Sequence, residues 1–300
     1  MTSVRSRLLI GWFRATGRKQ VFLDTSRFDR SIVDSQRKRT SKPPAKLYRR
    51  HHVRRTDVRG FPCVTLAPRE RASGQHVLYL HGGAYVHSIE RSHWRFVSRL
   101  VDLLACTVTV PVYPLAPDYH YDEAQAVIAE AYERHLADVD PAQQVVMGDS
   151  AGGGLTLVLA RMLREQGRPQ PAHLVLLSPW LDATMRDPAV PTLDRRDPYL
   201  STPGLLEAAR MYSGDLDPAD PLISPLNGTF DGLGRISVFI GTRDVLLLDS
   251  RRLRSAAARE GVDIDYVEYR DMVHGWPLLQ YIPEARRATA ELVDLLRAHR

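Results

Sequence analysis

Short apolar runs alternate with longer amphipathic stretches along most of the chain. The short runs are rich in β-branched and aromatic side chains, which favours strands at residues 61–67, 76–80, 107–113, 144–147, 173–177, 236–240 and 264–268. The longer stretches have apolar residues at helical spacing, at residues 92–104, 122–137, 151–166, 247–261 and 284–299. Continuous apolar strands that alternate with helices predict an α/β protein with a mostly parallel central sheet and helices on both faces.

Two regions depart from this alternation. Residues 1–40 read as helical without strand-like alternation, and Lys42-Pro43-Pro44 ends that region. Residues 181–225 contain seven prolines and one helical piece near residues 205–212. An insertion of this size inside an α/β domain is more typical of a functional lid than of a plain loop.

The overall composition is that of a soluble globular protein, with 300 residues, 44% hydrophobic and 25% charged. It excludes collagen, a coiled coil and wholesale disorder, and no apolar stretch is long enough to predict a transmembrane helix. The apolar residues 8–13 are too few for a signal-peptide core, so we expect them in a mature, cytoplasmic protein. Cys63 and Cys106 are too few for a disulfide framework and are interpreted as small buried side chains.

Charge is distributed unevenly along the chain. Residues 1–60 contain 17 Lys/Arg and 4 Asp/Glu, a net +13, whereas the remaining 240 contain 24 and 31, a net −7. Such an arm could bind nucleic acid or an anionic membrane, but it has no zinc-finger, helix-turn-helix or aromatic-stacking signature. We therefore expect no nucleic-acid partner and favour a helical lid docked on an acidic body. A weak membrane-surface contact through residues 8–13 and the neighbouring arginines stays open.

One motif between a predicted strand and a predicted helix has the pattern Gly-x-Ser-x-Gly: Gly148-Asp149-Ser150-Ala151-Gly152-Gly153. A sharp strand-to-helix turn places the serine hydroxyl above the sheet edge and requires small neighbours, which Gly148 and Gly152 supply. Ser150 is therefore the candidate nucleophile. A phosphate-binding loop is disfavoured because the GxxxxGK[ST] spacing and its lysine are missing. A tight packing turn without chemistry is the remaining alternative.

A second glycine motif follows the strand that ends at Leu80: His81-Gly82-Gly83-Ala84-Tyr85. Fixed backbone N–H groups can stabilise the oxyanion of a tetrahedral intermediate, and each donor contributes roughly 3 kcal/mol to lowering the barrier. We assign Gly82 and Gly83 as donors, together with the N–H of Ala151. A plain glycine turn is the alternative.

A serine nucleophile needs a base and an acid at the same sheet edge. His274 follows the last predicted strand, and Asp244 lies in the loop after the strand at residues 236–240. Asp249 is a rival to Asp244, but we expect it one turn into the next helix. The order Ser150, Asp244, His274 is the order of an α/β-hydrolase triad, and no metal site is expected.

Together these motifs resemble those of the bacterial hormone-sensitive-lipase-like (HSL) esterases of the α/β-hydrolase superfamily. The similar part spans about residues 61–300 and includes lesser matches at Tyr113-Pro114-Leu115-Ala116-Pro117, Ser178-Pro179-Trp180-Leu181-Asp182 and Ser224-Pro225-Leu226. The resemblance implies an α/β-hydrolase domain at residues 56–300, with a helical cap formed by residues 1–55 and an insertion at about 181–215. It also implies hydrolysis of carboxylic esters with short to medium acyl chains, without a cofactor.

The leading hypothesis is a serine ester hydrolase that acts on a small-molecule ester through an acyl-enzyme. An amidase or arylformamidase on the same scaffold and a non-enzymatic small-molecule receptor are the alternatives. Tyr85, Trp180 and Trp276 lie near signature residues, and lining of the substrate pocket or simple packing are equally compatible with them. The last strand and helix could form a homodimer edge, which the composition does not decide.

Overall fold

The structure is a computed structural model that describes residues 2–38 and 42–298. Its centre is one eight-stranded sheet with the order β1-β2-β4-β3-β5-β6-β7-β8. The strands are β1 (His52–Val58), β2 (Phe61–Ala67), β3 (His76–Leu80), β4 (Thr107–Pro111), β5 (Gln144–Asp149), β6 (His173–Leu177), β7 (Arg235–Gly241) and β8 (Ile264–Tyr269). The pairs β1–β2 and β2–β4 are antiparallel and the other neighbours are parallel, which confirms the predicted mostly parallel sheet.

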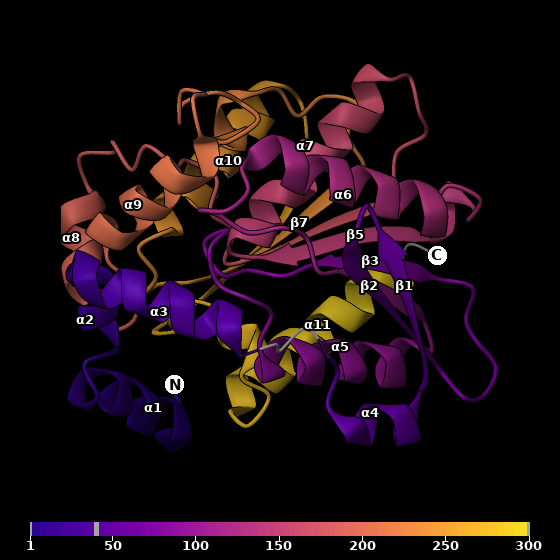
Figure 1. Cartoon of the computed structure of the whole chain (residues 1–300), viewed down its shortest axis with the longest axis horizontal. Helices are drawn as coiled ribbons and strands as arrows, with labels where there is room; N and C mark the ends of the chain where they lie inside the picture. Colours follow the sequence, from indigo (N-terminus) through magenta and orange to yellow (C-terminus); the bar gives the residue numbers. More distant parts are fainter. Residues whose placement is uncertain (1, 39–41, 299–300) are drawn as a thin grey trace.

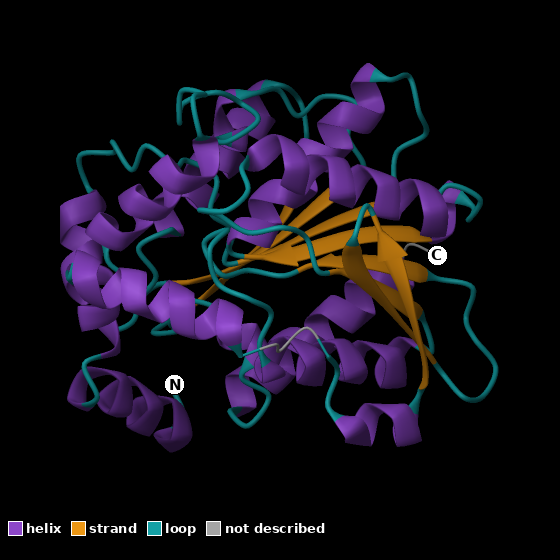
Figure 2. Ribbon diagram, in the orientation of Figure 1, coloured by secondary structure: helices purple, strands orange, loops and turns teal. Residues whose placement is uncertain are grey.

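Helices cover both faces of the sheet (Figures 1 and 2). One face is covered by α6 (Tyr121–His135), α7 (Ala151–Glu165) and α10 (Leu247–Arg259), and the other by α5 (Arg91–Leu104) and α11 (Pro283–Ala298). Alternate strand residues face opposite layers, so Val146 belongs to the core under α7 whereas Val145 and Met147 belong to the core over α5 and α11. Burial on both faces explains the continuous apolar runs of the central strands.

Further helices lie at the carboxyl edge of the parallel strands, on the left of Figure 1. They are α1 (Val4–Ala15), α2 (Arg18–Leu23), α3 (Thr25–Arg37), α8 (Val190–Arg196) and α9 (Thr202–Ser213). The backbones of α2 and α9 approach so closely that a Cβ on Gly204 would lie 2.8 Å from the ring of Phe22. The N-terminal segment and the insertion after β6 therefore pack together although they are far apart in the sequence.

The structure differs from the sequence prediction in several short elements. Strand β1, which was not predicted, occupies residues 52–58, so the expected boundary at residue 55 falls inside a strand of the sheet. It is an antiparallel edge strand with mostly exposed side chains, and it therefore lacks a continuous apolar run. Helices α4 (Ala45–Arg50) and α8 are too short to show helical periodicity. Residues 1, 39, 40 and 299, within predicted helical segments, lie outside the described residues.

No helix among the described residues is long and apolar enough to span a bilayer. Cys63 and Cys106 are both buried, as predicted.

Candidate active site

Ser150 occupies a strained turn between β5 and α7. Its φ of 53° and ψ of −121° are unfavourable for a non-glycine residue. A Cβ on Gly148 would overlap the carbonyl of Gly152, and a Cβ on Gly152 would overlap the carbonyl of Leu80, so both positions require glycine. The turn is fixed by hydrogen bonds of 2.9 Å from Ser150 N to Leu177 O and from Trp180 N to Ser150 O. The tightly packed glycines are those that the motif predicts.

His274 and Asp244 form a buried hydrogen-bonded pair. The Nδ1–H of His274 donates to Asp244 Oδ2 at 2.9 Å, and the second carboxylate oxygen accepts the N–H of Leu246 at 3.0 Å. Burial alone would lower the pKa of His274, but the charge of Asp244 and this hydrogen bond raise it above its ordinary value. With Nδ1 protonated, the neutral imidazole has its lone pair on Nε2, as a general base requires.

The loops that hold these residues are linked across the carboxyl edge of the sheet. Ser150 follows β5, Ser178 follows β6, Asp244 follows β7 and His274 follows β8, and these four strands are consecutive neighbours in the sheet. The N–H of Gly275 donates to Ser178 Oγ at 3.2 Å, and the N–H of Ser178 donates to Phe239 O at 2.7 Å. The predicted nucleophile, acid and base are thus brought to one edge of the sheet.

The rival carboxylate Asp249 has a different environment. It lies in the first turn of α10, as expected, and its Oδ2 accepts the N–H groups of Leu181 and Asp182, each at 3.0 Å. Burial raises the pKa of Asp249 to about 7. Asp249 therefore fastens the start of the insertion after β6, whereas Asp244 is the carboxylate that contacts His274.

The predicted oxyanion loop needs one correction. The N–H of Gly82 donates to Asp149 Oδ1 at 3.0 Å and is therefore already bonded, contrary to the donor role expected of it. The following residues have φ angles of 124° at Gly83 and 53° at Ala84, which turn the chain sharply. The N–H groups of Gly83, Ala84 and Ala151 donate to no acceptor within residues 2–38 and 42–298.

A buried polar cluster fixes Asp149 behind this loop. Its carboxylate also accepts Tyr79 Oη–H at 2.6 Å and His93 Nε2–H at 3.3 Å. The Nδ1 of His93 accepts the N–H of Glu90 at 2.8 Å, so His93 is the neutral tautomer with its proton on Nε2. Burial alone would raise the pKa of Asp149, but the hydrogen bonds from His93, Tyr79 and Gly82 hold it below its ordinary value. The carboxylate thus ties the loop that contains Gly82 and Gly83 to the turn around Ser150.

Two residues next to the Asp244–His274 pair were not indicated by any pattern in the sequence. Asp197 is buried, and its carboxylate accepts the N–H groups of Val245 at 2.9 Å and of Tyr199 at 2.7 Å. Burial and the nearby charge of Asp244 raise the pKa of Asp197 to about 7. The ring of Tyr199 lies parallel to that of His274, with centroids 6.3 Å apart. Both residues come from the proline-rich insertion, where the pattern indicated only a lid.

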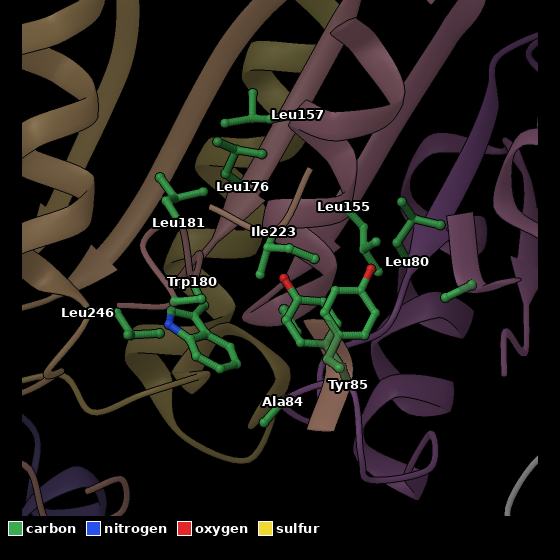
Figure 3. Close-up of a cluster of buried hydrophobic side chains, with 14 of the residues drawn as sticks. Leu80, Ala84, Tyr85, Leu155, Leu157, Leu176, Trp180, Leu181, Ile223 and Leu246 are labelled. Atoms are coloured by element: carbon green, nitrogen blue, oxygen red, sulfur yellow. The ribbon is translucent and has the colours of Figure 1, made fainter. Parts of the chain in front are cut away.

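Of the three aromatic candidates, two lie beside α7. The rings of Tyr85 and Tyr212 stack with centroids 3.8 Å apart, and Trp180 lies 5.4 Å from Tyr85. A Cβ on Gly154, one turn after Ser150, would lie 3.0 Å from the Tyr85 hydroxyl, so Tyr85 covers the first turn of α7. Figure 3 shows Tyr85 and Trp180 in a cluster of buried side chains that also contains Leu155 and Ile223.

Trp276 lies elsewhere. It packs against Tyr269, with centroids 5.3 Å apart, in the core formed with α5 and α11. Trp276 therefore packs in the hydrophobic core, which is the second of the two roles considered for it, and does not line a substrate pocket.

Comparison with known protein families decides to which family the chain belongs. The family described as "alpha/beta hydrolase fold" matches residues 77–278. The chain belongs to the α/β-hydrolase family. The matched range contains Ser150, Asp244 and His274 and both glycine motifs. The fold class predicted from the sequence is thereby confirmed.

Individual relatives of this α/β hydrolase cover most of its length. LipR from Mycobacterium tuberculosis is 37% identical over 248 residues, which are 82% of this chain and 80% of LipR. An acetyl-hydrolase from Streptomyces hygroscopicus is 34% identical over 220 residues, 73% of this chain and 74% of that protein. The crystal structure of an esterase from the bacterial HSL family has a TM-score of 0.84 at 30% identity and covers 100% of this chain and 99% of its own. The resemblance to HSL-family esterases is confirmed.

Proposed function

We propose that this α/β hydrolase is a serine carboxylic ester hydrolase that acts through an acyl-enzyme. The observation that carries the proposal is the buried Asp244–His274 hydrogen bond of 2.9 Å, at the same sheet edge as a serine held at positive φ. The acetyl-hydrolase and the HSL-family esterase among its relatives support the same reaction class. Ser150, Asp244 and His274 are the proposed catalytic residues.

The proposed reaction follows from the protonation states of the pair. Ser150 Oγ attacks the ester carbonyl carbon while His274 Nε2 accepts the hydroxyl proton, and the carbonyl oxygen becomes an oxyanion. Asp244 keeps Nδ1–H oriented and stabilises the imidazolium that forms. Collapse of the intermediate breaks the bond to the alcohol oxygen, which receives the proton from His274. Water, activated by the same imidazole, then releases the carboxylic acid and regenerates Ser150.

The proposed oxyanion hole consists of the N–H groups of Gly83, Ala84 and Ala151. These groups have no acceptor among the described residues, and Ala151 also begins α7, whose N-terminus favours negative charge. In this arrangement Gly82 contributes indirectly. Its hydrogen bond to Asp149 holds the loop in position next to Ser150.

We further propose that the substrate has a short acyl chain. Tyr85, Tyr212 and Trp180 are each at most 2% exposed and fill the space along the first turn of α7. A long acyl chain attached to Ser150 would have to displace these stacked rings. In the same proposal α1–α3 and the insertion at about 181–215 form the cap, and the hydrolase domain begins with β1.

The test is hydrolysis of p-nitrophenyl esters from acetate to palmitate. We expect the highest kcat/KM at acetate to butyrate and a loss of several orders of magnitude in Ser150→Ala. Ser255→Ala, an exposed serine of α10, is the matched control and should retain wild-type activity. Residual turnover of Ser150→Ala near the wild-type level would exclude the proposal.

The chain-length proposal has its own test. Replacing the stacked ring in Tyr212→Leu should move the optimum towards longer acyl chains without loss of acetate hydrolysis by more than about tenfold. An unchanged chain-length profile in a folded variant would exclude the aromatic wall as the limit. Matched p-nitroanilides, cleaved at least as fast as the esters, would instead favour the amidase alternative.

A further inference from the structure

Helix α1 has two apolar faces, and only one of them packs against the protein. Leu9, Ile10 and Phe13 are buried on the inner side. The outer side presents Val4, Leu8 and Trp12, which are 61%, 68% and 49% exposed and follow one another at intervals of four residues. Four-residue spacing aligns these side chains in a single stripe along the helix. Large exposed apolar side chains in a contiguous stripe mark an interaction surface.

Arginine side chains border this stripe on both sides. At 100° per residue, Arg5 lies on the same side of the stripe as Trp12, about two turns before it, whereas Arg7 and Arg14 lie on the other side. The guanidinium of Arg18, in α2, lies 5.2 Å over the ring of Trp12. Within the described part of the chain, none of these four arginines is recorded in an ion pair with a carboxylate. Residues 1–23 contain no acidic side chain, so the helix itself adds only positive side-chain charge to this face.

The inner side fixes the helix firmly to the hydrolase. Ser3 N and Ser6 Oγ each donate a hydrogen bond of 2.6 Å to the Glu284 carboxylate of α11. Phe13 contacts the ring of Tyr199 at a centroid distance of 5.3 Å, and Tyr199 in turn lies along His274. Figure 1 shows α1 at the edge of the molecule, below α2. The outer stripe is therefore held in a fixed position, two aromatic contacts from the active site.

We propose that the outer face of α1 docks on the surface of an anionic lipid bilayer. Val4, Leu8 and Trp12 would enter the boundary between headgroups and acyl chains, and the flanking arginines would contact lipid phosphates. An apolar stripe bordered by basic residues, with a tryptophan at its edge, has the composition of a helix that lies in the membrane interface. With 12 residues, α1 lies along the surface rather than across it. Docking would bring the cap and His274 close to membrane-borne esters.

One feature of this face favours lipid over nucleic acid, and a second feature makes the docking face larger. The centre of the face is apolar, whereas contacts to a nucleic-acid backbone need polar and basic groups throughout. Tyr281, which is 50% exposed, adjoins the helix because Arg5 donates to its carbonyl oxygen at 3.3 Å. A second interfacial aromatic side chain thus lies beside the arginine edge of the stripe.

Trp12 supplies a direct probe for the test. The other three tryptophans, Trp94, Trp180 and Trp276, are at most 1% exposed, so a change in the emission maximum on adding lipid reports Trp12. The full chain is titrated with vesicles of phosphatidylglycerol and phosphatidylcholine, and in parallel with phosphatidylcholine alone. We expect a blue shift and co-sedimentation with the anionic vesicles, both weakened by added salt.

Matched variants assign the binding to the stripe. The double variant Val4→Ser/Leu8→Ser should partition onto anionic vesicles roughly tenfold or more weakly than wild type. Leu206→Ser/Leu222→Ser removes two leucines that are 43% and 42% exposed elsewhere and should bind as wild type. Hydrolysis of soluble p-nitrophenyl acetate should be unchanged in both double variants. Failure of lipid binding is therefore distinguishable from failure of the proposed esterase function.

Three results would overturn the proposal. The first is wild-type protein that neither sediments with anionic vesicles nor changes its emission. The second is equal binding of Val4→Ser/Leu8→Ser and wild type. The third is a lipid-independent dimer in sedimentation that Val4→Ser/Leu8→Ser abolishes, because a second copy of the chain would then cover the stripe.

Discussion

Two buried Asp–His pairs, Asp149–His93 and Asp244–His274, lie at the same sheet edge. They differ in whether the imidazole nitrogen that does not contact the carboxylate has a hydrogen-bond partner. In Asp149–His93 the carboxylate accepts from Nε2, and Nδ1 is occupied by the N–H of Glu90. In Asp244–His274 the carboxylate accepts from Nδ1, and no bond to Nε2 is recorded within residues 2–38 and 42–298. The same two residue types therefore form a fixed support in one place and the proposed proton-transfer pair in the other.

The difference follows from the elements that carry the histidines. His93 belongs to the first turn of α5. Its ring accepts the backbone N–H of Glu90, the residue that caps the helix, and this bond fixes its orientation. His274 lies in the loop after β8 and faces the ring of Tyr199. A histidine with both nitrogens bonded to protein groups cannot accept a substrate proton without breaking a bond. An unoccupied nitrogen, rather than the presence of a carboxylate partner, thus distinguishes the candidate catalytic pair.

The largest expected effect comes from breaking the Asp244–His274 pair. His274→Ala should lower kcat by about four to six orders of magnitude, because the base for Ser150 is lost. Asp244→Asn should lower kcat by about four orders of magnitude, since the amide no longer favours the tautomer with Nδ1–H. Steady-state hydrolysis of p-nitrophenyl acetate measures both, and circular dichroism checks that the variants fold. Activity of either folded variant within tenfold of wild type would remove the pair from the mechanism.

A smaller effect is expected at the supporting carboxylate. Asp149→Asn keeps an acceptor for Gly82 but places an N–H opposite His93, so the loop should shift. We expect kcat to fall by roughly 10- to 100-fold with little change in KM, because the loss affects the oxyanion rather than substrate binding. Binding of a boronic acid that mimics the tetrahedral intermediate should weaken in parallel. A loss of stability without weaker boronate binding would show that Asp149 serves folding alone.

The supporting histidine should matter less than its carboxylate. His93→Gln can still donate to Asp149, so we expect kcat to fall by about tenfold or less. Its pH–rate profile should match that of wild type, because His93 transfers no proton in this account. A shifted acid limb of kcat/KM in His93→Gln would contradict the separation of the two pairs.

The smallest effect is a change in pH dependence at Asp197. In its ionised form, which is incomplete below its own raised pKa of about 7, Asp197 contributes to the raised pKa of His274. Asp197→Asn should therefore lower the pKa of His274, so that the base becomes neutral at lower pH and the acid limb of kcat/KM shifts down by less than one pH unit. Asp231→Asn, an exposed carboxylate, is the control. An acid limb that shifts upward in Asp197→Asn would have the wrong sign for this account.

The sheet and the motif residues could be predicted from the chain because their determinants are local. Central strands are buried on both faces and appear as continuous apolar runs, and the turn around Ser150 needs small residues at fixed spacing. Strand β1 was not predicted because an exposed edge strand tolerates charged side chains such as Arg54 and Arg55. The helices α4 and α8 are too short for a periodic pattern.

The remaining site features depend on contacts between distant segments. The role expected of Gly82 was wrong because its N–H is bonded to Asp149, which is 67 residues away. Asp197 and His93 were not predicted for the same reason, since their partners Val245 and Asp149 come from distant segments of the chain. Spacing within one motif cannot show which amide a tertiary contact has already occupied.

The central claim is that Ser150 forms an acyl-enzyme with His274, and not His93, as its base. The most direct measurement is peptide mass spectrometry of wild type, His93→Gln and His274→Ala after brief reaction with p-nitrophenyl acetate and an acid quench. The account predicts an acetyl group on the peptide that contains Ser150 in wild type and His93→Gln, and none in His274→Ala at the same time point. An acetyl group on another residue, or equal labelling of Ser150 in His274→Ala, would contradict it.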